Sequence, residues 1–95
     1  KTVVLSENRP MDKKKVNDWI QDLFTAYGNK LLRSKGFFYF KNDDYRYEFQ
    51  AVRKTYHSKA DKKWEDSEER KSVVVLIAED EIDSAMIQKS FSSCC

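Results

Sequence analysis

A run of four aromatic residues, Phe37-Phe38-Tyr39-Phe40, constrains the fold of this chain more than any other feature. Aromatic side chains favour the pleated, half-buried surface of a sheet, so the run predicts a strand. Because successive side chains of a strand point to opposite faces, both faces of this strand are apolar. One face can pack against helices, and the other must meet a second layer, a ligand or a partner. Gly36, just before the run, indicates a bulge or a close approach of two backbones.

Residues 13–27 carry the clearest helix pattern in the chain. Apolar side chains recur at helical spacing through the segment and form one continuous stripe. Asp12 is a suitable N-cap, Met11 and Val16 occupy the positions of a hydrophobic staple, and Gly28 follows the last apolar residue. These signals predict a helix over residues 13–27 that presents one apolar face to a sheet.

Shorter patterns predict the other elements. β-Favouring or alternating runs indicate the remaining strands, over residues 2–6, 45–56 and 72–78. The charged segment 58–71 is expected to be a loop, which Trp64 anchors to the sheet. A last helix is expected after Asp83, another N-cap candidate.

The order strand–helix–strand–strand–strand–helix predicts an α+β fold. We expect a two-layer sandwich in which a four-stranded mixed sheet carries both helices on one face and is bare on the other. The length of 95 residues fits a single domain, residues 1–95. The chain begins at a lysine and enters a strand-like run at once, which suggests a piece cut from a longer protein, with a processed mature chain as the alternative.

Composition argues against two classes of function, duplex-DNA binding and membrane association, and indicates the cellular setting. The formal net charge of +2 is too balanced for the concentrated positive face of a duplex-DNA binder. No apolar run is long enough to span a bilayer, and no leader pattern is present, so we expect no membrane association. The two cysteines are adjacent and cannot staple distant parts of the fold, which favours a reducing, cytoplasmic setting.

The bare sheet face is the predicted interaction surface. We expect it to use a subset of five aromatic residues: Phe37, Tyr39, Tyr45, Tyr47 and Phe49. Alternation alone leaves open which of these rings face the helices. Four basic residues, Arg33, Lys35, Arg53 and Arg70, are either ordinary solvated charges or a basic rim for an anionic partner.

The same aromatic run also allows a nucleic-acid alternative. Lys35-Gly36-Phe37-Phe38-Tyr39-Phe40 is similar to the strand motif with which RNA-recognition domains stack bases on an open sheet. Phe38 stands where that motif needs a small residue, and the run falls on the second expected strand instead of the third. Packing within the protein or against another protein is therefore the favoured interpretation, with RNA stacking as the alternative.

The search for reactive groups yields one weak metal hypothesis and no catalytic site. His57, Cys94 and Cys95 could join in a thiophilic metal site if the fold brings them together, although zinc prefers three or four well-spaced ligands. Burial of Cys94 as a small hydrophobic residue is the competing interpretation. The chain has no nucleophile–base arrangement and no glycine-rich phosphate loop, so we expect a non-catalytic domain without a cofactor of its own.

Taken together in order, short matches along the whole chain resemble the C-terminal domain of the CobW family of metallochaperone GTPases. They are Arg9-Pro10-Met11, Arg33-x-Lys35-Gly36-Phe37, Phe49-Gln50-Ala51-Val52, Trp64, Arg70, the strand 73–78, Ile82-Asp83, Ile87, Phe91 and Cys94. The sequence departs from the family pattern at Ala78, where glycine is usual, and in the segment after Val52, which lacks the glycines often found there.

The resemblance implies a longer protein. In that family an N-terminal P-loop GTPase domain binds GTP and Mg²⁺ and carries a Cys-x-Cys-Cys motif for a transition metal, zinc or cobalt, which is delivered to a client protein or a cobalamin-related pathway. None of those residues lies in this chain. The resemblance therefore implies a C-terminal module that acts in interdomain contact, client docking or formation of a homo-oligomer.

Overall fold

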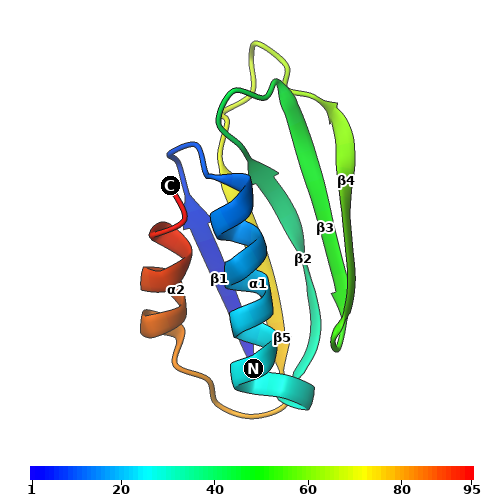
Figure 1. Ribbon diagram of the computed structural model, residues 1–95, viewed down its shortest axis with the longest axis vertical. Helices are drawn as coiled ribbons and strands as arrows, with labels where there is room; N and C mark the ends of the chain where they lie inside the picture. Colours follow the sequence, from blue (N-terminus) through cyan, green and yellow to red (C-terminus); the bar gives the residue numbers. More distant parts are fainter.

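The computed structural model describes residues 1–95 and consists of one five-stranded sheet and two helices (Figure 1). The strands are β1 (Thr2–Glu7), β2 (Leu31–Tyr39), β3 (Tyr45–Val52), β4 (Thr55–Lys63) and β5 (Ser72–Ala78). The helices are α1 (Lys13–Tyr27) and α2 (Ser84–Ser92), with a short 3-10 helix, η1 (Gly28–Lys30), after α1. Figure 1 shows both helices in front of the same sheet face, so the predicted α+β two-layer architecture is confirmed.

The strand count differs from the prediction, five instead of four, because the chain reverses inside the segment expected to form a single strand. Val52 pairs with Thr55, which leaves a tight two-residue turn in which Arg53 adopts a positive φ of 53°. β4 then begins within the expected strand 45–56 and continues to Lys63, into residues that were expected to be loop. Nearly every side chain of β4 is exposed, so its sequence has no apolar periodicity to reveal a strand.

The sheet is antiparallel throughout, whereas a mixed sheet was expected. The strand order is β1-β5-β2-β3-β4, and each of the four neighbouring pairs is antiparallel. The crossover through α1 does bring β1 and β2 into the same direction, but β5 lies between them and pairs with both. The parallel neighbours implied by the sequence are therefore separated by one antiparallel strand.

Helix α1 has the predicted boundaries and end signals. The Asp12 carboxylate accepts a hydrogen bond from the backbone N–H of Lys15 at 3.0 Å, and Met11 and Val16 are both buried. Gly28 ends the helix with a φ of 54°, a backbone conformation that residues other than glycine rarely adopt.

The hydrophobic core lies between the helices and the sheet. Eighteen buried residues form one cluster, with Phe38 at its centre. The Phe38 ring lies 5.5 Å from Phe40, 5.6 Å from Phe49 and 6.4 Å from Phe91 of α2, measured between ring centroids. This packing assigns Phe38 of β2, and Phe40 directly after the strand, to the helix side of the sheet.

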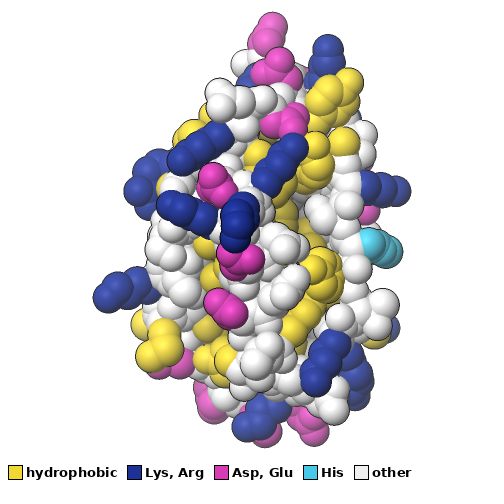
Figure 2. Space-filling view, in the orientation of Figure 1, with side chains coloured by type: hydrophobic (Ala, Val, Ile, Leu, Met, Phe, Trp, Pro, Cys, Tyr) yellow, Lys and Arg dark blue, Asp and Glu magenta, His cyan; other side chains and the backbone are white.

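Figure 2 looks onto the helix side and shows Lys, Arg, Asp and Glu side chains mixed over its surface. Such mixing is typical of a solvated helix layer and marks no large field of one sign. Neither helix has the length and apolar character that crossing a membrane would require.

Candidate functional site

The sheet face opposite the helices, here called the open face, has no second layer packed on it. Its odd-numbered β5 residues, Val73, Val75 and Ile77, alternate with the buried core residues of the same strand. Three of the five exposed large hydrophobic side chains lie on this face: Val4 is 59% exposed, Val52 57% and Ile77 40%. Such apolar side chains on a face without a cover are typical of an interaction surface.

Cross-strand pairing arranges this face in rows. Arg33 on β2 stands between Ile77 on β5 and Val52 on β3. The next row places Lys35 between Val75 and Gln50. Arg33 therefore has an aliphatic neighbour on each side, whereas Lys35 has one aliphatic and one amide neighbour.

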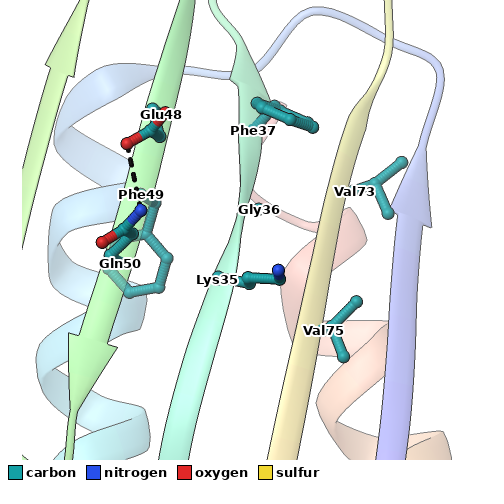
Figure 3. Close-up of a pocket in the computed structure, with 8 residues that line it drawn as sticks. All are labelled: Lys35, Gly36, Phe37, Glu48, Phe49, Gln50, Val73 and Val75. Carbon is teal, nitrogen blue, oxygen red and sulfur yellow. Dashed lines mark hydrogen bonds between the residues drawn. The ribbon is translucent and has the colours of Figure 1, made fainter.

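Two adjoining hollows of about 220 and 370 Å³ run along β2 on this face. Lys35, Gln50 and Val75 line both of them. Figure 3 looks onto the open face, with the helices behind the sheet, and shows the Lys35 and Val75 side chains on the viewer's side. Together the hollows form a groove, the β2 groove, whose floor is sheet and whose borders are aliphatic and basic side chains together with Phe37, Glu48 and Gln50.

Gly36 allows the close approach that the sequence predicted. A β-carbon at this position would lie 2.0 Å from the carbonyl oxygen of Val73 and 2.7 Å from the α-carbon of Val74. The absence of a side chain therefore lets β2 lie directly against β5 beneath the groove.

The five aromatic residues of the predicted surface do not share one face. Phe37 and Tyr39 lie on the open face, half-buried, whereas Phe49 is 2% exposed and belongs to the core. Tyr47 is partly buried against the core, with its ring 5.1 Å from Phe40. Tyr45, at the start of β3, is exposed, and Lys63 lies 5.8 Å from its ring centroid. The part of the set on the open face is thus Phe37 and Tyr39.

Both aromatic rings on the open face already contact other side chains of this chain. The Arg46 guanidinium lies 3.9 Å from the centroid of Phe37, in cation–π geometry, and pairs with Asp61 on β4. Tyr39 packs edge-on against Trp64 at 5.9 Å. Trp64 is buried, as the sequence predicted for an anchor, and its indole N–H has no acceptor within the chain. Base stacking would first have to displace these partners.

The aliphatic residues of the open face were not singled out from the sequence, although a signal was present. Residues 72–78 read as apolar on both faces, and two helices on one side can cover only one of those faces. The exposed valine and isoleucine side chains are the second, uncovered half of that pattern.

The candidate metal ligands lie in different parts of the fold. His57 is exposed on β4, beside Glu48 and Gln50 of the open face. Cys94 is buried on the helix side, where its thiol donates to the backbone oxygens of Lys15 and Ser90 at 3.7 and 3.5 Å. No group of three or more His, Cys, Asp or Glu residues is arranged to hold a metal ion. The residues of this chain therefore do not fit a transition-metal site.

Cys94 is expected to be far less reactive than Cys95. Burial raises the pKa of the Cys94 thiol to about 11, so at pH 8 about one thiol in a thousand is ionised. Treatment of the folded protein with iodoacetamide at pH 8, followed by peptide mass spectrometry, should modify Cys95 first. Urea should remove the difference, because unfolding exposes both thiols. Equal alkylation rates in the folded protein would contradict the burial of Cys94.

Comparison with known proteins places this fold in a family. The family model for the cobalamin synthesis protein cobW C-terminal domain matches residues 1–95. The chain belongs to this family. Its similarity to the CobW C-terminal domain, first suggested by short sequence matches, thus extends over the whole of its length. A comparison with curated protein sequences gave no match.

Two crystal structures show what a CobW C-terminal domain can be part of. The zinc-bound YjiA GTPase from E. coli matches with a TM-score of 0.92 and 25% identity over 100% of this chain and 29% of YjiA. A zinc-bound triple mutant of the YjiA GTPase matches with a TM-score of 0.92 and 26% identity, over 99% of this chain and 29% of that one. The present chain thus spans less than a third of the GTPases that it matches.

The 95 residues contain no glycine-rich phosphate loop. Their two glycines serve backbone geometry, Gly28 at the end of α1 and Gly36 in the middle of β2, and neither belongs to a glycine-rich loop before a helix.

Proposed function

We propose that this chain is the non-catalytic C-terminal module of a CobW-like GTPase and that its open face docks against the GTPase domain of the same protein. The parent protein would hydrolyse GTP with Mg²⁺ through that N-terminal domain and deliver zinc or cobalt to a client protein in the cytoplasm. The module would hold the GTPase domain in a defined position and leave the nucleotide and metal chemistry to it.

The observation that carries this proposal is the exposed aliphatic set on the open face. Val4, Val52 and Ile77 are exposed, and Val73 and Val75 are half-buried on the same face. The helix side, in contrast, buries most of its apolar side chains in one core and exposes mixed charges, with Met86 as an exposed large hydrophobic residue. More than two thirds of the matching GTPase lies outside the part that this chain covers, which supplies an occupant for the face.

The proposal can be tested by calorimetric unfolding of the full-length protein. Ile77→Lys should uncouple the two domains, because docking would bury a lysine charge against an apolar surface, and one joint transition should become two. Met86→Lys is the matched control, since Met86 is another exposed large hydrophobic residue, 65% exposed on α2.

Circular dichroism of the variants must first show that the sheet persists, which is expected because both positions are exposed in the domain. If Ile77→Lys unfolds the full-length protein in the same way as Met86→Lys does, the open face is not the docking surface.

A further inference from the structure

We infer that the surface seated on the β2 groove presents carboxylate groups to Arg33 and Lys35, so the docking contact is a charge-paired one set among aliphatic side chains. The inference rests on the proposed function and specifies the chemistry of the partner. Its occupant is an acidic segment of the GTPase domain, in the part of the protein beyond these 95 residues.

Two of the four basic residues noted in the sequence already have partners in this chain. Arg70 pairs with Asp44 at 3.4 Å, and Arg53 donates to the backbone oxygen of Asn29 at 2.9 Å. Arg33 and Lys35 make neither an ion pair nor a side-chain hydrogen bond, and both are exposed. Of these four basic residues, the two without a partner in this chain therefore both lie on β2, the middle strand of the open face.

The neighbours of these two side chains decide what can cover them. Arg33 lies between Ile77 and Val52, and Lys35 lies next to Val75. A partner that buries the aliphatic side chains must also remove water from the two cations. Burying an unpaired charge is strongly unfavourable, and the aliphatic contacts of this small groove are too few to compensate for it. A partner with carboxylates at matching positions offsets much of that cost and accepts bidentate hydrogen bonds from the arginine.

The acidic residues of the open face do not supply these carboxylates. Glu48 accepts a hydrogen bond from Gln50 at 3.1 Å, and Asp61 pairs with Arg46. An anionic partner of another class, nucleic acid, is less well matched, because Arg46 covers Phe37 and Trp64 packs against Tyr39. A groove with aliphatic borders, whose aromatic rings are already covered by other side chains, suits a protein surface better than it suits nucleic-acid bases.

Carbodiimide cross-linking of the full-length protein tests the inference directly, because the reagent joins an amine to a carboxylate in contact with it. Peptide mass spectrometry should find Lys35 joined to an aspartate or glutamate of the GTPase domain. Lys35→Arg is the matched variant: it keeps the charge and the docking, so the joint unfolding transition should persist, but the cross-link should disappear. Lys89 of α2, exposed and without an ion pair, reports background coupling.

A second variant measures the energetic part of the inference. In the double variant Arg33→Gln/Lys35→Gln, calorimetry should show two separate unfolding transitions, the first at a lower temperature than the joint transition of the wild-type protein. In the wild-type protein, the coupling between the two domains should weaken as the NaCl concentration rises. If Ile77→Lys uncouples the domains while the double glutamine variant does not, and Lys35 forms no cross-link above the Lys89 background, docking stands and the charge pairing is overturned. If a single-stranded RNA probe binds with an affinity that falls steeply as salt rises, and if it prevents cross-linking of Lys35, the anionic partner is nucleic acid and the inference fails.

Discussion

Replacing Gly36 by alanine is expected to lower the free energy of unfolding by about 3 kcal/mol or more, a large share of the total stability of a domain of this size. A β-carbon at Gly36 would lie 2.0 Å from the Val73 carbonyl oxygen and 2.9 Å from its carbonyl carbon. Both obstructing atoms are backbone atoms of β5, so no side-chain rotation can relieve the contact. The strands β2 and β5 would have to separate, which breaks the ladder at the centre of the sheet.

Ser34→Ala is the matched control, two residues away on the same strand. Ser34 is buried, and its hydroxyl has no hydrogen-bond partner, so Ser34→Ala removes an unpaired buried polar group and is expected to leave stability unchanged or raise it by up to about 1 kcal/mol. Urea unfolding followed by circular dichroism measures both variants. A Gly36→Ala protein as stable as Ser34→Ala would show that β2 and β5 are not in close contact.

Replacing Phe38 by alanine is expected to cost about 3–5 kcal/mol, because the ring fills the centre of the core and leaves a cavity that its neighbours cannot close. Phe38 is 1% exposed and lies within 6.4 Å of three other rings, measured between centroids. Phe37, the preceding residue, lies on the opposite face and is half-buried beneath Arg46. Phe37→Ala should therefore cost about 1 kcal/mol.

This neighbouring pair tests the assignment of the two faces of β2. Urea unfolding of the two variants should give clearly different midpoints, with Phe38→Ala much the less stable. Equal losses, or a larger loss for Phe37→Ala, would mean that the helices cover the other side of the strand.

The parts of the fold that the sequence predicted correctly are those with local signals. Helix α1 begins at the residue after Asp12 and ends before Gly28 because a capping side chain, an apolar stripe and a glycine act within a few residues of one another. β4 was missed because its side chains face water and only its pairing with β3 holds it in the sheet. The turn before it uses Arg53 at a position where glycine or asparagine would have signalled the reversal.

The candidate site was predictable in outline. Period-two alternation showed that the aromatic strand is apolar on both sides, but alternation cannot say which side the helices cover. That choice depends on contacts distant in sequence, such as those of Phe38 with Phe49 and Phe91. The separation of His57 from Cys94, and the pairing of Arg70 with Asp44, likewise follow from the assembled sheet and not from spacing along the chain.

Hydroxyl-radical footprinting tests the central claim, that the open face is covered in the parent protein, more directly than any variant. Side-chain oxidation would be compared between the full-length protein and the 95-residue domain. Phe37 and Ile77 should be protected several-fold in the full-length protein, whereas Met86, exposed on α2, should be oxidised equally in both. Equal oxidation of Phe37 and Ile77 in the two proteins, or protection of Met86 alone, would contradict docking through the open face.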